Sequence, residues 1–550
     1  MPLEIRNASA EDAPGWLSLA RDTLGEDHPA KQVFDMGWIV RELGDESSHE
    51  TWIADQDGKT MAAISFLEFQ PRSLDDSLSF RMPKGLKSAE NPVANLGRNL
   101  FRPESYPDGS AAELVRKISR LATERRQLAI VRVLASDNKQ QVLFEQEGFV
   151  CVGFQPDKHH HRTREEVLFY VKPVRAIIST RVALSESLPQ INELASAAMT
   201  NLRISGTLSL RDGGTGYPLQ TDVEFQGHSD EKYIQRRGEM ESLHPHHEIS
   251  GGFNTGHGFM RVPGKMPTNA IIATRQDEIV GGVRYLFDEM DRCVRVMDAF
   301  CTDNLSLGAL FHELIKVSQA ELNSFYVEVD ILLTSVRLLI SAEQLGFVPV
   351  AYFPGFFKHA EGNLDVVKMV KFNQNIDIDA VNLTSHAEAI LKVVTNCLKD
   401  QSMGTAIVNM LRDLAIFKGL GDGELRKLGR LFIQKLFKPG EVIFNRDDVG
   451  NEAFVVMRGQ VDIVLSEKSQ PLASMEQGQV FGELAFLDGS TRGAMAIAKQ
   501  PTILLIINRI QFFELTQREP NLGQAVMKNI ALELGSRIRR MNAAFESSGG

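Results

Sequence analysis

The chain has 550 residues, 43% of them hydrophobic and 24% charged, with a formal net charge of -11. This length predicts about three to four domains, each with a core of its own. The acidic balance argues against broad affinity for nucleic acid, and the four scattered cysteines indicate neither a disulfide framework nor a zinc site. Because no run of about 18 apolar residues and no leader-like start is present, we expect a cytoplasmic protein without a membrane span.

The first organised segment alternates helix and strand. A turn, YPDGSAAEL from Tyr106, opens a helical stretch over 110–126, and a strand-like apolar run follows over 128–136. The stretch EQEGFVCVGFQP, from Glu145, then predicts a helix end, a glycine in the left-handed conformation at Gly148, and an alternating apolar strand.

The same order of elements recurs later in the chain. The turn DNLSLGALF, from Asp303, opens a helical stretch over 307–322, and a strand follows over 325–335. The stretch EQLGFVPVAYFP, from Glu343, repeats EQEGFVCVGFQP at seven of twelve positions without a gap. Two α/β units are therefore predicted, over 1–175 and 176–372.

These two segments resemble the GNAT superfamily of N-acetyltransferases, in which a strand leads through a glycine-containing turn into a helix and a later helix ends in Gly-Phe. The resemblance implies two mixed-sheet α/β units, with a coenzyme A site where the amides at the helix start hold the pyrophosphate. Gly109, Ser110 and Ala111 match this turn in the first segment, so we expect them to bind acetyl-CoA. In the second segment, Ser306 and Gly308 match the turn, but Asp303 replaces a basic or amide residue and would repel a pyrophosphate.

The sequence does not identify the catalytic residues. Many members of the superfamily carry a tyrosine four residues before the glycine of Gly-Phe, where its hydroxyl can protonate the leaving thiolate. The corresponding residues here are Phe144 and Ala342, and neither can give a proton. Either another acid or water takes this role, or one or both units have kept the fold and lost the reaction.

Two groups of histidines, at 159–161 and at 244–247, invite a metal-site interpretation. Neighbouring side chains on a strand point to opposite faces, and no HExxH spacing is present. We therefore predict polar loops or a hairpin and no metal. The glycine-rich stretch over 251–265 predicts a solvated loop, with a substrate-facing role as the alternative.

The pattern changes after the second α/β unit. A polar stretch with one helix over 373–404 indicates a linker, and short alternating strands broken by Gly440, Gly450 and Gly459 follow it. Regular turns between short strands predict a β jelly roll with flanking helices over 405–550.

This last part resembles the cyclic nucleotide-binding domain, whose phosphate-binding cassette is matched by FGELAFLDGSTRGA from Phe481. The resemblance implies that Arg492 binds the cyclic phosphate of cAMP or a related nucleotide with forked hydrogen bonds, and that Glu483 accepts from the ribose hydroxyl. The departures at Thr491 and Gly493 leave open which nucleotide is bound. The residues expected at the nucleotide are Gly482, Glu483, Leu484, Arg492, Gly493 and Ala494.

Together, the resemblances predict a cyclic-nucleotide-regulated N-acyltransferase that transfers acetyl from acetyl-CoA to a protein lysine or a small amine. This is similar to known bacterial fusions of the two domain types, although here the sensor stands last. The short stretch after Met541 leaves no room for a DNA-reading module, so we expect neither a DNA nor a membrane partner. The alternative is a non-catalytic nucleotide sensor or scaffold with degenerate transferase folds, which Phe144, Ala342 and Asp303 favour.

Overall fold

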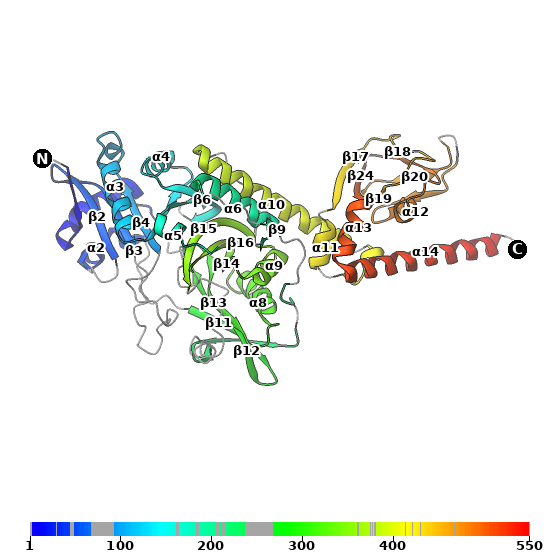
Figure 1. The fold of residues 1–550 in the computed structure, drawn as a ribbon, viewed down its shortest axis with the longest axis horizontal. Helices are drawn as coiled ribbons and strands as arrows, with labels where there is room; N and C mark the ends of the chain where they lie inside the picture. Colours follow the sequence, from blue (N-terminus) through cyan, green and yellow to red (C-terminus); the bar gives the residue numbers. More distant parts are fainter. Residues whose placement is uncertain are drawn as a thin grey trace. The chain divides into compact units, whose positions relative to one another are not determined.

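The computed structural model describes residues 3–548 with gaps. The positions outside the described residues are 1–2, 29, 45–48, 68–92, 161–163, 183–185, 205–208, 211–215, 220, 230–231, 237–267, 360–361, 375, 377, 379–380, 413, 421, 430, 467–468 and 549–550. The predicted loop over 251–265 and the histidines over 244–247 therefore lie outside them. The chain divides into two units, Met1–Leu398 and Lys399–Gly550, each described by itself (Figure 1).

The first half of unit 1 alternates strands and helices, which confirms the order of elements predicted over 106–156. Its elements are β1 (Glu4–Asn7), η1 (Ala10–Asp12), α1 (Ala13–Leu24), η2 (Lys31–Phe34), α2 (Met36–Gly44), β2 (His49–Gln56), β3 (Lys59–Leu67), β4 (Val93–Phe101), η4 (Pro103–Ser105), α3 (Ser110–Glu124), β5 (Leu128–Leu134), α4 (Asn138–Gln146), β6 (Val150–His160) and β7 (Arg164–Lys172).

The second half repeats this alternation and ends in a long helix. Its elements are α5 (Arg175–Ile178), β8 (Glu186–Ser187), α6 (Pro189–Leu202), β9 (Ser209–Leu210), β10 (Glu224–Ser229), β11 (Thr268–Arg275), β12 (Glu278–Asp288), β13 (Cys293–Cys301), α8 (Leu307–Ala320), β14 (Tyr326–Leu332), α9 (Val336–Gln344), β15 (Val348–His359), β16 (Gly362–Phe372) and α10 (Ser385–Arg412). Gly148 and Gly346 follow α4 and α9 with φ of 81° and 86°, the left-handed conformation predicted for helix ends. Most of α10 lies in the predicted linker over 373–404, but the helix continues to Arg412.

One sheet runs through unit 1 in the order β1-β2-β3-β4-β5-β7-β6-β15-β16-β14-β13-β12-β11-β10. From either edge inward the pattern is the same: antiparallel strands, then a parallel pair, then a closing hairpin. In both parallel pairs, β4 with β5 and β13 with β14, the pairing stops before the strands end, after Leu96↔Val131 and Arg295↔Glu328. The two halves therefore share one topology.

The halves meet at a single backbone pairing of β6 with β15, Gly153 opposite Ala351. These two residues hold the same position in the two repeated stretches, so a local twofold relation passes between them. A Cβ on Gly153 would lie 2.2 Å from the Cβ of Ala351, so this approach requires glycine. Helices α6 and α10 lie side by side here, and Asn201 Nδ2 donates to the backbone oxygen of His386 at 3.1 Å (Figure 1).

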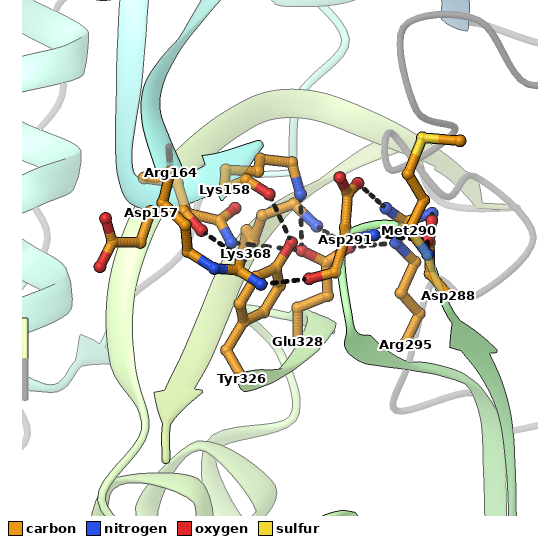
Figure 2. A network of polar contacts seen from close by, with 11 residues as sticks. Asp157, Lys158, Arg164, Asp288, Met290, Asp291, Arg295, Tyr326, Glu328 and Lys368 are labelled. Atoms are coloured by element: carbon orange, nitrogen blue, oxygen red, sulfur yellow. Dashed lines mark hydrogen bonds and ion pairs between the residues drawn. The ribbon is translucent and has the colours of Figure 1, made fainter. Parts of the chain in front are cut away.

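A buried cluster of charged side chains also joins the halves (Figure 2). Lys158 of β6 donates to Glu328 of β14 with Nζ and Oε2 2.8 Å apart, and Arg295 of β13 donates from Nε to Oε1 of the same carboxylate at 2.8 Å. Lys368 of β16 lies 3.9 Å from Glu328 and 2.7 Å from Asp330. All five side chains are buried, so the loss of one leaves a charge without compensation.

Unit 2 is a β jelly roll with flanking helices, as predicted. Its strands form two sheets, in the orders β17-β24-β19-β22 and β18-β23-β20-β21. Its elements are η6 (Ala415–Phe417), α11 (Asp422–Gly429), β17 (Phe432–Phe437), β18 (Val442–Phe444), β19 (Glu452–Arg458), β20 (Val461–Val464), β21 (Ala473–Met475), β22 (Val480–Phe481), α12 (Glu483–Asp488), β23 (Met495–Ala498), β24 (Thr502–Asn508), α13 (Arg509–Arg518) and α14 (Pro520–Ser548).

Strand β19 separates two apolar cores of unit 2, because successive side chains of a strand point to opposite faces. Phe454 and Val456 belong to the core that also holds Phe481 of β22. Ala453 and Val455 belong to the core beneath the flanking helices, to which α12 contributes Phe486. Helix α12 thus joins the jelly roll to the helices that follow it.

Candidate functional site

The segment predicted to bind a nucleotide phosphate runs from β22 through α12 to β23. Gly482 caps the start of α12 with a φ of 74°, a left-handed conformation that favours glycine, and Gly489 ends the helix with the same φ of 74°. A Cβ on Gly482 would lie 2.7 Å from Nη1 of Arg492. The two glycines therefore fold the segment so that Arg492 lies against the start of α12.

Arg492 is held inside unit 2, with only 4% of its surface exposed. Its Nη1 donates to the carbonyl oxygen of Gly482 at 2.8 Å, and its Nη2 donates to that of Glu452 at 2.7 Å. The guanidinium also lies over the rings of Phe444 and Phe454, 4.4 Å and 5.5 Å from their centroids. Among the described residues, the groups that accept hydrogen bonds from this buried cation or lie against it as rings are thus neutral.

The electrostatics of Arg492 favour an anion as its further partner. Burial lowers the pKa of Arg492 from its ordinary value, and the charges of Glu452, Asp448 and Glu483 only oppose this shift. Among the described residues, Nε has no hydrogen-bond partner. A phosphate fits this environment, because its oxygens accept forked hydrogen bonds from a guanidinium and supply the missing charge.

The other residues predicted to contact the nucleotide lie near Arg492 in the sequence and differ in how exposed they are to solvent. Glu483, the first residue of α12, and Ala494 are half-buried, whereas Leu484 is 60% exposed. Gly493 is exposed, and a Cβ there would meet no atom within 4 Å. The absent side chain at Gly493 therefore leaves open space beside Arg492, while the contact of Glu483 with a ribose stays a prediction.

The sequence did not predict that two further residues, Gly450 and Glu452, belong to this site. Gly450 packs so closely that a Cβ would lie 2.2 Å from the Cβ of Ala485 and 3.2 Å from Cζ of Arg492. Glu452 takes part through its backbone oxygen, which any residue could supply. The sequence marks Gly450 only as a strand breaker, because the fold alone brings it to Arg492.

Gly109, Ser110 and Ala111, predicted to bind acetyl-CoA, lie at the start of α3. Gly109 caps the helix with a φ of 82°, and a Cβ there would meet no atom within 4 Å. Ser110 and Ala111 are buried. The exposed Asp108 already accepts from the amide of Ser110 at 2.8 Å and from its hydroxyl at 2.7 Å. A phosphate at this helix start therefore has to displace the Asp108 carboxylate.

The corresponding turn of the second half is filled by its own chain. Asp303 accepts from the amides of Leu305 and Ser306 at 3.0 Å and 2.9 Å, and pairs with Arg275 at 3.0 Å. A Cβ on Gly308 would lie 2.5 Å and 2.7 Å from the backbone oxygens of Pro218 and Tyr217. Carboxylate and carbonyl oxygens thus face this helix start, and a pyrophosphate does not fit there.

Phe144 and Ala342, which replace the family's tyrosine, are both buried. Phe144 packs edge-on against Phe101 and Phe149, with ring centroids 6.2 Å and 5.2 Å apart. Tyr106 adjoins this group through Phe101 at 6.0 Å, and burial raises the pKa of its phenol. These rings therefore pack against one another as part of the core, and their arrangement does not identify a catalytic residue.

Comparison with known proteins identifies the class of unit 2. Residues 434–519 match the family model of the cyclic nucleotide-binding domain, so unit 2 contains a domain of this family. The chain is 32% identical over 134 residues to the cyclic AMP receptor protein of Thermus thermophilus, a match that covers 24% of this chain and 60% of that protein. It is 25% identical over 146 residues to a cyclic nucleotide-gated channel of Caenorhabditis elegans, covering 26% of this chain and 20% of the channel. The chain thus spans less than two thirds of either relative.

Two solved structures are also similar to this chain. The catabolite activator protein of Thermus thermophilus is 30% identical, with a TM-score of 0.22, over 24% of this chain and 62% of that one. The N-terminal domain of a transcriptional regulator from Streptomyces coelicolor is 24% identical, with a TM-score of 0.22, over 24% of this chain and 96% of that one. The absence of a DNA partner stays a prediction.

The helices can be compared with the requirements of a membrane span. Within the part of the chain that the structure describes, no helix is long and apolar enough to cross a membrane. The cytoplasmic location stays a prediction.

Proposed function

We propose that this protein is a cyclic-nucleotide-responsive regulator, in which the C-terminal domain binds a cyclic nucleotide and thereby controls unit 1. The observation that carries the proposal is Arg492, a buried guanidinium whose hydrogen-bond partners are two backbone carbonyl groups. A cyclic phosphate gives this cation an anionic partner, and we assign Glu483 to the ribose hydroxyl. The nucleotide to test first is cAMP, because one relative is named a cyclic AMP receptor protein.

Calorimetric titration of the full-length protein with cAMP and cGMP tests this proposal. Arg492→Lys keeps the charge but loses the forked donor, so we expect affinity to fall by about 10- to 100-fold. Arg458→Lys, at the exposed end of β19, is the matched control and should bind like the wild type. Equal binding by Arg492→Lys, or no binding of either nucleotide by the wild type, contradicts the proposal.

For unit 1 we propose an N-acyltransferase that uses acyl-CoA and an amine acceptor. The observation that favours it is the topology shared by both halves, with a parallel pair that parts before its strands end. This topology accompanies the two turns and the two Gly-Phe helix ends that resemble the acetyltransferase superfamily. The amine acceptor, a protein lysine or a small molecule, is part of the same proposal.

Within unit 1 we assign acyl-CoA to the first half, at Gly109, Ser110 and Ala111. Support comes from the contrast between the two helix starts. Asp108 is exposed and can turn away, whereas Asp303 is paired with Arg275, and backbone oxygens of the chain at Tyr217 lie against Gly308 in the same turn. The rival proposal is a non-catalytic sensor or scaffold, which the buried Phe144 and Ala342 favour.

An assay of thiol release from acetyl-CoA, with a panel of amines and with or without cAMP, separates the two proposals. Asp108→Asn removes a carboxylate from the helix start, so acetyl-CoA should bind about two- to fivefold more tightly. Asp303→Asn is the matched control and should leave acetyl-CoA binding unchanged. Neither thiol release nor acetyl-CoA binding in any variant would leave the scaffold as the better account.

A further inference from the structure

Helix α12 is held at both ends by arginine side chains. At its start, Nη1 of Arg492 donates to the carbonyl oxygen of Gly482 at 2.8 Å. In its last turn, Nε of Arg509 donates to the carbonyl oxygen of Phe486 at 2.8 Å, and Nη2 donates to that of Leu487 at 3.4 Å. Carbonyl groups in the last turn of a helix lack partners within the helix, so a cation there satisfies them and the negative end of the dipole.

Arg509 belongs at the same time to the helix that follows the jelly roll. It is the first residue of α13, and its guanidinium lies 5.1 Å from the ring centroid of Phe513. Its backbone amide donates to the oxygen of Asn451 at 2.8 Å. Asn451 is the neighbour of Glu452, whose oxygen accepts from Arg492. One short stretch of chain therefore contacts both arginines.

The remaining packing between α12 and the helices is apolar and leaves space. Phe486 of α12 lies 5.3 Å from Phe512 and 6.3 Å from Phe513, measured between ring centroids. An apolar pocket beside Phe486 is lined by Phe432 and Val455 of the jelly roll and by Phe512, Val526 and Ile530 of the helices α13 and α14. Apolar contacts with free space permit α12 to shift, whereas the hydrogen bonds of Arg509 fix its end to α13.

We propose that Arg509 is the positioning residue that passes a change at Arg492 on to α13 and α14. This inference rests on the proposed nucleotide binding. A phosphate that accepts from Arg492 competes with the carbonyl oxygen of Gly482 and weakens the hold on the start of α12. Arg509 keeps the other end of α12 attached to α13, so a shift of α12 moves α13 and, through the shared apolar core, α14.

Hydrogen exchange of the full-length protein, with and without saturating cAMP, tests the inference. In the wild type we expect protection over 482–494 and a change of about threefold or more in exchange over 509–530. In Arg509→Met, protection over 482–494 should persist at saturation, while the change over 509–530 is lost. Arg509→Lys keeps a charge at the helix end without the fork and should retain part of that change.

The outcomes separate this inference from the proposed function. A change over 509–530 in Arg509→Met equal to that of the wild type overturns the role of Arg509, even if nucleotide binding stands. No protection over 482–494 in the wild type overturns the nucleotide binding and the inference with it. If Arg509→Met does not fold, Arg509→Gln takes its place under the same criteria. Arg458→Met, which removes an exposed arginine of β19, should behave as the wild type.

Discussion

Arg492 is costly to bury, and its surroundings are arranged to tolerate the charge without neutralising it. Carbonyl dipoles of Gly482 and Glu452 and the ring of Phe444 stabilise a cation, but they leave its net charge in place. The sequence could predict that Arg492 and Gly482 belong to one phosphate-binding segment, because both lie in the contiguous stretch from Phe481 to Ala494. Gly450 and Arg509 could not, since only the fold brings them to α12.

Substitution of Gly450 tests how tightly this site is packed. Gly450→Ala places a Cβ 2.2 Å from that of Ala485, so we expect a loss of about 1–3 kcal/mol of stability in unit 2. Gly493→Ala meets no atom within 4 Å and should change stability by about 0.5 kcal/mol or less. Residues 399–550 contain neither Trp nor Tyr, so calorimetry rather than intrinsic fluorescence follows this unit. Equal losses in both variants would contradict the packing argument.

At the scale of elements, the repeated stretches predicted the helix ends and strands of both halves, because Gly-Phe after a helix is a local signal. The strand that forms the outer edge of the sheet in each half could not be predicted in the same way. In the first half the edge strand β1 precedes α1, whereas in the second half β10 follows α6. Equally, no local pattern shows that Pro218 and Tyr217 cover the start of α8, because this contact joins residues far apart in the chain.

Gly153 decides how closely β6 and β15 approach. Gly153→Ala should cost unit 1 about 1–3 kcal/mol, because the new Cβ meets Ala351 across the junction. Gly227→Ala in β10 meets no atom within 4 Å and is the control. Urea denaturation followed by tryptophan fluorescence measures the difference, since the three tryptophans of the chain, Trp16, Trp38 and Trp52, lie in unit 1. A Gly153→Ala protein as stable as the control would show that the junction relaxes freely.

Across the whole molecule, one continuous helix and one buried cluster of charges connect parts that lie far apart in sequence. Helix α10 places Ala387 and Ile390 in the core of unit 1 and Leu411 in a core of unit 2. The buried cluster around Glu328 joins the halves of unit 1 (Figure 2). The sequence does not predict this cluster, because its charges come from four strands, β6, β13, β14 and β16, that only the fold brings together.

The charge of Glu328 makes unit 1 sensitive to acid. Burial alone would raise the pKa of Glu328, but the charges of Lys158, Lys368 and Arg295 outweigh burial and hold the pKa well below its usual value. A depressed pKa contributes stability above the unfolded value, about 4.3, and that contribution is lost as pH falls through the folded value. In Glu328→Gln, stability should therefore depend less on pH below about 4.5.

The same variant should also be less stable at neutral pH. Glu328→Gln leaves buried cations without their carboxylate, so we expect a loss of about 3–5 kcal/mol in the fluorescence-detected transition of unit 1. Lys316→Met breaks the exposed pair with Glu313 and should cost about 1 kcal/mol or less. A small neutral-pH effect together with an unchanged acid dependence would show that Glu328 does not act as a paired anion.

The proposed regulation requires that a cyclic nucleotide bound at Arg492 changes unit 1. Hydrogen exchange of the full-length protein over 385–398, the part of α10 that belongs to unit 1, tests it most directly when saturating cAMP is added. We expect altered exchange over 385–398 in the wild type and a smaller change in Arg492→Lys at the same cAMP concentration, in proportion to its weaker binding. Protection over 482–494 without any change over 385–398 would contradict the claim that the nucleotide regulates unit 1.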